Sequence, residues 1–235
     1  GGNKMRYTVD EAVFEINPEI KFGILIGSNI KNSETSAEDE KRLREAEENM
    51  RKTVKAEEVR ALPNVALYRE VMAKAGINPN KFLPSVEAMF KRILKGGALP
   101  KINALVDLCN AVSIEQIISL GAHDLSDIHE DLEVCFSRGG DKFIPFGSEE
   151  PEMVEEGELV FKSGNYVQTR KWIWRQSELG KTTLDSKDIF FQLVGFGDDP
   201  SLNNAMAGIE DLIINRFGGS SKKYLVDINN RYIDF

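Results

Sequence analysis

The stretch that decides the fold is residues 84–110, which read PSVEAMFKRILKGGALPKINALVDLCN. Its first part predicts a helix over about 84–95, because Pro84 suits a first helical turn and a Gly-Gly pair follows the last turn. Its last part predicts a second, more apolar helix over about 102–112. The stretch therefore predicts two consecutive helices separated by a turn that contains Gly and Pro.

The sequence on either side of this stretch has two different characters. Beyond residue 119, short β-branched or aromatic runs alternate with Gly, Pro, Asp and Ser, which predicts strands. The other expected elements are a strand over 22–29, a charged helix over 36–60, helices over about 65–75 and 201–217, and a strand over 223–228. We expect residues 1–235 to form a single α+β domain, with helices mainly in the N-terminal half and a mixed or antiparallel sheet in the C-terminal half.

Composition narrows the class of protein. The 235 residues are 41% hydrophobic and carry a formal net charge of −8, and an acidic chain needs a local basic patch to bind nucleic acid. No run approaches the ~18 apolar residues of a membrane helix, and no basic leader precedes an apolar segment. Cys109 and Cys135 lie in apolar surroundings, which favours reduced thiols. We expect a cytoplasmic protein with no membrane partner.

Three polar residues stand out within the helix expected over about 102–112. Asn103, Asp107 and Asn110 are spaced i, i+4, i+7 and therefore form one stripe on that helix. A separate, core-facing arc consists of Ile102, Leu105, Val106, Cys109 and Val112. The polar stripe has two interpretations: it faces water, or it lies at the edge of a pocket that holds a polar ligand.

Familiar catalytic motifs are absent from the sequence. It contains no phosphate-binding Gly-rich loop with its Lys, no GxGxxG after a strand, no GxSxG and no HExxH. Zinc could be considered for Cys109, His123, His129 and Cys135, but no pair among them has the spacing of a zinc site. We expect neither a metal nor a cofactor.

The segment RKWIWRQ, residues 170–176, is the most unusual in composition. Residues 162–181 around it carry five basic groups against one acid. On a strand, the two tryptophans would share one face and pack in the core, with cationic neighbours at the edge. The other interpretation is a stacking surface for an RNA end, with these candidate contacts: Arg170, Lys171, Trp174 and Arg175.

The order of motifs from residue 84 to GAHDL at 121–125 resembles the B3/B4 tRNA-editing domain of the bacterial phenylalanyl-tRNA synthetase β-subunit. The later segments GGDKFIPFG, GELVF, WIWR and DIFFQLV are similar to stand-alone relatives of that domain. The resemblance covers most of residues 60–200. It implies a B3/B4-like fold, a tRNA or aminoacyl-tRNA end or a free amino acid as partner, and deacylation of a mischarged aminoacyl ester by a positioned water.

The resemblance also implies an amino-acid pocket. Asn110 stands at a pocket Asn of the family and Cys109 replaces the preceding Thr, whereas the family's functional His and Glu fall on Gly121 and Gln192. His123, two residues further on, would share a face with Gly121 on an extended segment. The candidates for substrate binding are Asn103, Asp107, Cys109, Asn110, Gly121, Ala122, His123 and Gln192. The candidates for catalysis are Asn110, His123 and Gln192.

These residues leave two main hypotheses. One is a free-standing hydrolase that clears mischarged aminoacyl-tRNA without the family's His and Glu. The other is a non-catalytic module that binds an amino acid or an RNA end, and an interaction role for the charged 36–60 helix is a third option. In both main hypotheses we expect Asn110 to point into a cleft walled by the strand that carries Gln192.

Overall fold

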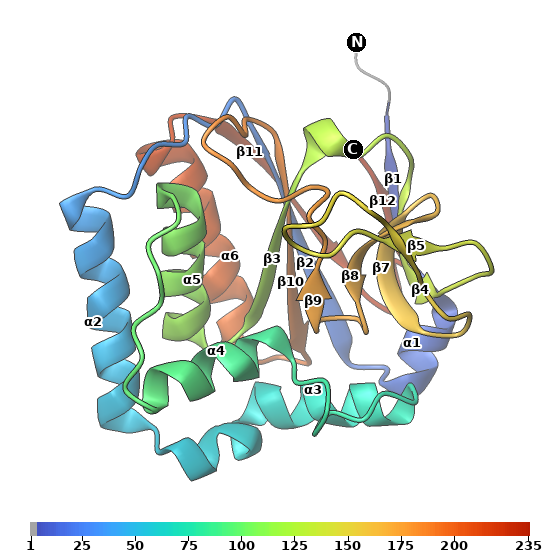
Figure 1. Cartoon of the computed structure of the whole chain (residues 1–235), viewed down its shortest axis with the longest axis horizontal. Coiled ribbons are helices and arrows are strands. Elements are labelled where there is room, and N and C mark those ends of the chain that lie inside the picture. Colours follow the sequence, from blue (N-terminus) through green and yellow to red (C-terminus); the bar gives the residue numbers. More distant parts are fainter. Residues whose placement is uncertain (1–3) are drawn as a thin grey trace.

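The computed structural model of the protein describes residues 4–235, which form two β-sheets packed face to face and a layer of helices (Figure 1). The helices α5 and α6 cover the outer face of one sheet, α2 packs on the outer side of α5, and α3 and α4 run across one end of the molecule. The bounds of these helices are α2 Ala37–Thr53, α3 Pro63–Lys74, α4 Ser85–Leu94, α5 Ala104–Gln116 and α6 Pro200–Asp211. The expected α+β class is confirmed.

The first sheet has the antiparallel order β11-β2-β10-β3. Its strands are β11 Ser220–Val226, β2 Ile20–Ser28, β10 Ile189–Phe196 and β3 Ser119–Asp124. Every residue of β10 is buried, because this strand lies between two others and both of its faces are covered.

The second sheet is mixed, with the order β12-β1-β4-β7-β8-β5-β6, and β9 pairs with β8. The pairs β1–β4 and β5–β8 are parallel and the others are antiparallel. Its strands are β1 Arg6–Val9, β4 Leu132–Phe136, β5 Lys142–Phe143, β6 Glu152–Met153, β7 Leu159–Ser163, β8 Tyr166–Arg170, β9 Arg175–Gln176 and β12 Tyr232–Asp234.

Local sequence accounts for the ends of the helices. Ser36 and Asp39 form a capping box at the start of α2, which satisfies two otherwise unpaired backbone N–H groups. This helix ends at Thr53, earlier than expected, and a 3-10 helix over Ala56–Ala61 follows it. The remaining helices are α1 Glu11–Ile16, a 3-10 turn over Leu125–Asp127 and a π-helical turn over Leu212–Arg216. No helix in the described chain is both long and apolar enough to cross a membrane.

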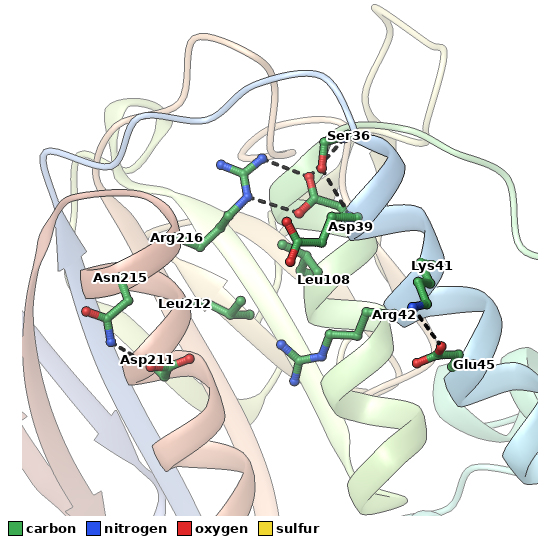
Figure 2. A pocket seen from close by; sticks show the side chains of 11 residues that line it. Ser36, Asp39, Lys41, Arg42, Glu45, Leu108, Asp211, Leu212, Asn215 and Arg216 are labelled. Atoms are coloured by element: carbon green, nitrogen blue, oxygen red, sulfur yellow. Dashed lines mark hydrogen bonds and ion pairs between the residues drawn. The ribbon is translucent and has the colours of Figure 1, made fainter.

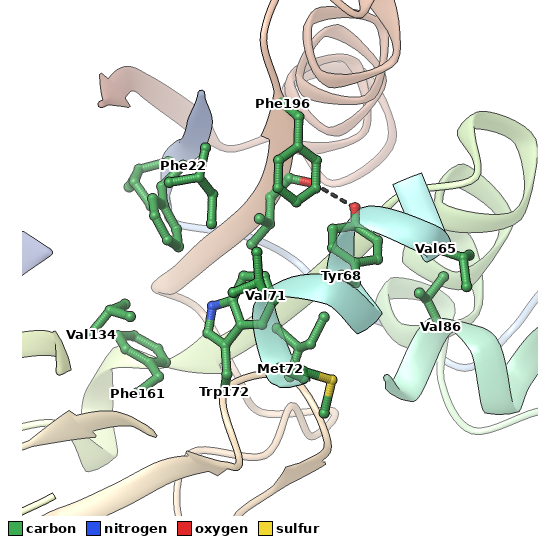
Figure 3. Packing of buried hydrophobic residues seen from close by; sticks show 14 of the residues in the cluster. Phe22, Val65, Tyr68, Val71, Met72, Val86, Val134, Phe161, Trp172 and Phe196 are labelled. Atoms are coloured by element: carbon green, nitrogen blue, oxygen red, sulfur yellow. Dashed lines mark hydrogen bonds between the residues drawn. The ribbon is translucent and has the colours of Figure 1, made fainter. Parts of the chain in front are cut away.

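The two large parts of the hydrophobic core lie on the two faces of the first sheet, and a small third cluster lies on the second sheet. Side chains alternate along β10, so Phe191 and Leu193 pack with α5 and α6, whereas Phe190 and Val194 pack toward the second sheet. Figure 3 shows part of the second group, where Trp172 meets Tyr68 of α3. Gln192 lies on this inter-sheet side as well, because it is two residues from both Phe190 and Val194.

Candidate functional site

A cavity of about 110 Å³ lies beside the edge strand β3, between the first sheet and the hairpin of β8 and β9. Gly121, His123 and Gln192 line it from the first sheet, and Trp172 and Arg175 line it from the hairpin side. Since one water needs about 10–15 Å³ of such volume, the cavity has room for several waters or a small ligand group.

The register of β3 against β10 directs the His123 side chain into the cavity. Gly121 pairs with Gln192 and His123 pairs with Phe190, so both β3 residues face the second sheet. A Cβ atom on Gly121 would lie 3.2 Å from Nε2 of His123. The imidazole therefore occupies the space in front of position 121, as expected for two residues two apart on a strand.

The protonation of His123 follows from its partner. Its Nδ1 lies 3.0 Å from Oε1 of the fully buried Gln168. With the Gln168 amide oriented this way, its oxygen accepts, so Nδ1 carries the proton and Nε2 presents a lone pair. Burial lowers the pKa of His123 from 6.5 to about 4, against a smaller opposing effect of the Gln168 hydrogen bond. The ring is therefore neutral near pH 7, and Nε2 has no hydrogen-bond partner within residues 4–235.

Gln192 is held from the second sheet. Its Oε1 accepts a 2.6 Å hydrogen bond from the hydroxyl of Tyr7 on β1. Burial raises the pKa of that hydroxyl well above its ordinary value, so Tyr7 remains a donor. The Gln192 amide nitrogen donates no hydrogen bond to the described residues and is free to meet a ligand in the cavity.

Trp172 reaches the cavity through a turn that the sequence did not predict. Residues 170–176 were expected to form one strand, and this prediction is wrong: β8 ends at Arg170, and Lys171 and Trp172 have φ of 48° and 66°. The turn separates the two tryptophans, leaving Trp172 fully buried and Trp174 partly buried. The indole Nε1 of Trp172 has no hydrogen-bond partner among the residues described.

The predicted basic patch is largely neutralised by acids from other parts of the chain. Arg170 and Lys171 contact Glu158 at 2.8 and 2.9 Å, and the buried Lys162 contacts Asp141 at 2.7 Å. Of the three cationic residues among the predicted RNA contacts, Arg175 alone has no ion-pair partner within residues 4–235. The Arg175 guanidinium lies 4.5 Å from the Trp174 ring centroid and is exposed.

The polar stripe of α5 lies elsewhere. Asn103 caps α5 and bonds to Asn32, and Asp107 accepts hydrogen bonds from the Thr35 hydroxyl and the Ile102 N–H. These contacts brace the loops before α2 and α5. The expected core residue Ile102 is itself 59% exposed, because it precedes the helix rather than forming its first turn.

The structure does not bring Asn110 to the cavity. Asn110 is half-buried on α5, and α5 packs with Phe191 and Leu193, on the face of β10 opposite Gln192. The expected cleft shared by Asn110 and Gln192 is therefore corrected to two opposite faces of one sheet. Cys109 is buried in the same helical cluster, where burial raises the pKa of its thiol to about 12. Ala122 also packs toward that cluster.

A larger groove of about 690 Å³ runs between α2, α5 and α6 (Figure 2). Arg216 contacts Asp39 at 2.8 Å there, and Lys41 lies 3.8 Å from Glu45. Asp211 accepts a hydrogen bond from Asn215. Because these polar groups largely satisfy one another, the smaller cavity is the better candidate site.

Sequence reasoning identified Gly121, His123 and Gln192 but missed Tyr7, Gln168 and Trp172. Tyr7 and Gln168 lie far from the others in sequence and carry no local motif. Trp172 was assigned to the core, which is correct for its ring, but its unpaired N–H becomes visible only once the turn is known.

The fold and site define an α+β protein with a small polar cavity between two sheets. A family model described as "B3/4 domain" matches residues 67–205, a range that includes Gly121, His123, Gln168, Trp172 and Gln192. The chain belongs to this family, which confirms the resemblance seen in the sequence.

Comparison with solved structures gives a similar fragment. It is an N-terminal fragment of the phenylalanyl-tRNA synthetase β-subunit from Pyrococcus horikoshii, with 11% identity and a TM-score of 0.44. The match covers 93% of this chain and 53% of the fragment, so the chain spans about half of that structure's length. No curated protein matches the sequence.

Proposed function

We propose that the cavity hydrolyses the ester that links an amino acid to the end of a tRNA, with His123 as the base that activates water. One observation carries this proposal: a neutral, buried imidazole presents an unpartnered Nε2 to the space in front of Gly121. The family's functional His falls on Gly121, and the His123 ring lies over that position.

The proposed reaction uses groups already in place. Nε2 of His123 takes a proton from a water, and the resulting hydroxide attacks the acyl carbon of the ester. The tetrahedral intermediate then expels the ribose oxygen, which receives the proton from His123, and the products are a free amino acid and deacylated tRNA. Gln168 keeps the ring in the required tautomer, and the Gln192 amide N–H, oriented by Tyr7, can bond a substrate oxygen.

The mouth of the cavity suits an RNA end. Arg175 lines the cavity and stacks against Trp174, so a guanidinium and an indole are available to a phosphate and a terminal base. The overall charge of −8 opposes RNA binding, so we expect weak affinity that falls steeply with added salt.

The test is deacylation of a panel of mischarged tRNAs, beginning with tyrosyl-tRNA(Phe). We expect His123→Ala to lower kcat/KM by about 100-fold or more, the usual contribution of a general base. His129→Ala is the matched control, because it removes the other histidine, which is exposed. Hydrolysis by the wild type no faster than the spontaneous rate across the panel would exclude an editing hydrolase.

A non-catalytic binding module is the second candidate. The residues lining the cavity include no carboxylate, and a pKa of about 4 makes His123 a weak base. Calorimetry with free amino acids and short CCA-ended RNAs separates the two functions, since a module would bind these without turnover of the charged tRNA.

A further inference from the structure

We infer that the indole N–H of Trp172 is the donor that holds an acyl oxygen of the ligand in this cavity. Trp172 is 0% exposed, lines the cavity with His123 and Gln192, and its Nε1 meets no acceptor in the described part of the chain. In Figure 3 the indole nitrogen lies on the edge of the ring turned away from Tyr68. The inference rests on the proposed function only for the identity of the acyl compound.

An unpaired buried donor requires an explanation. The great majority of buried polar groups in native proteins have a partner, because desolvation without a hydrogen bond is costly. Phenylalanine at this position would offer an apolar ring without that cost. Four buried side-chain atoms of residues 4–235 lack a partner, and among them only Trp172 Nε1 belongs to a residue that lines the cavity. An acceptor that arrives with a bound molecule would complete its hydrogen bonding.

The turn fixes this donor in place. Lys171 and Trp172 both have positive φ, a conformation that is unfavourable for residues other than Gly. The backbone N–H of Trp172 donates to the Leu159 carbonyl at 2.7 Å, and the backbone N–H of Lys171 donates to the Glu158 carboxylate at 3.0 Å. Tyr68 packs edge-on against the indole, with ring centroids 6.0 Å apart. A strained turn with these anchors presents a rigid donor.

The unpaired groups define the chemistry of the ligand. Trp172 Nε1 and the Gln192 amide nitrogen need acceptors, whereas His123 Nε2 needs a donor such as water. An ester or amide carbonyl beside a water satisfies both requirements, and a carboxylate satisfies the acceptor requirement. The shared chemistry is an acyl oxygen. A hydrocarbon of the same size would leave all three groups unpaired.

The protein contains two tryptophans, so its indole N–H spectrum has two resonances. In Trp174→Phe only the Trp172 resonance remains, so this variant assigns that resonance and serves as the matched control. We would titrate uniformly ¹⁵N-labelled protein with alaninamide, alanine and ethylamine, which offer a carbonyl, a carboxylate and no acyl oxygen. We expect the Trp172 indole proton to shift downfield with alaninamide or alanine and to be unaffected by ethylamine.

A larger shift with alaninamide identifies a neutral carbonyl as the preferred ligand group, and a larger shift with alanine identifies a carboxylate. Trp172→Phe should weaken binding of the preferred compound about tenfold, read from the Gln192 amide resonances, because it removes one hydrogen bond. The absence of any shift, or equal affinity in this variant, would overturn the inference. A shift in a protein without deacylase activity would support the inference and exclude only the hydrolysis.

Discussion

The buried polar side chains on the two faces of the first sheet differ in how completely they are hydrogen-bonded. On the helical side, Asn103 and Asp107 are both buried and direct their side-chain oxygens into hydrogen bonds with neighbouring loops. On the inter-sheet side, His123, Gln192 and Trp172 are also buried, yet no hydrogen bond within residues 4–235 engages His123 Nε2, the Gln192 amide nitrogen or Trp172 Nε1. Asn64 Oδ1 and Ser221 Oγ are unpaired within that range as well and lie outside the cavity, so it is the gathering of three such atoms around one cavity that marks the candidate site.

The strongest test of this comparison is Asp107→Ala. The change leaves the Thr35 hydroxyl and the Ile102 N–H without their acceptor. At about 2 kcal/mol for each bond to a charged group, the free energy of unfolding should fall by about 4 kcal/mol in urea denaturation. Binding of alaninamide at temperatures where the variant is folded should not change.

Asn110→Ala is the control for that variant. Asn110 is half-buried and its side chain makes no hydrogen bond within the described chain, so the loss should be below ~1 kcal/mol. If this variant instead abolished ligand binding at unchanged stability, the assignment of the site to the inter-sheet face would be wrong.

A smaller effect concerns the pH dependence of stability. Burial lowers the pKa of His123 from 6.5 to about 4. Between these two pH values His123 is therefore protonated in the unfolded chain and neutral in the folded chain. The contribution of His123 is fully present above about pH 6.5 and is lost as the pH falls to about 4. It amounts to roughly 3 kcal/mol.

Comparison of His123→Gln with the wild type isolates this contribution, because the carboxylates titrate alike in both proteins. The free energy of unfolding of the variant should depend less steeply on pH between 4 and 6.5. His129→Gln should retain the wild-type slope. Equal slopes in all three proteins would mean that His123 is not buried in its neutral form.

Gly121→Ala should also change stability only slightly. The added Cβ would lie 3.2 Å from His123 Nε2, so the ring must move by a few tenths of an ångström, at a cost of about 1 kcal/mol. The sensitive measurement is the ¹⁵N shift of His123 Nε2, which should change. Ala122→Gly, on the opposite face, should leave that shift unaltered.

Much of the fold follows from sequence patterns. The predicted helices over 65–75, 84–95 and 102–112 appear as α3, α4 and α5, and the strand over 22–29 appears as β2. These elements have strong periodicity or clear end signals. The strand predicted over 170–176 was wrong because the prediction rested on local residue preferences, which favour a strand there. The left-handed turn at Lys171 and Trp172 instead depends on hydrogen bonds to other parts of the chain.

The candidate site was predictable only in part. Gly121, His123 and Gln192 could be found from the resemblance and the period-2 alternation of strands. The polar stripe of α5 was placed in the pocket because helical periodicity identifies a face but not what covers it. Likewise, the apparent excess of basic residues near 170 disappeared because Asp141 and Glu158 come from other segments.

The ends of the second sheet have a practical consequence for work with this protein. Strands β1 and β12 pair, and Met5 and Phe235 exchange two backbone hydrogen bonds of 2.8 Å. Tyr7, which orients Gln192, lies on β1, between β12 on one side and β4 on the other. A tag or truncation placed next to Met5 or Phe235 can therefore disturb the pairing of β1 and β12 and, through Tyr7, the wall of the cavity. Fusion proteins need a spacer at these ends before their activity is compared with that of the untagged protein.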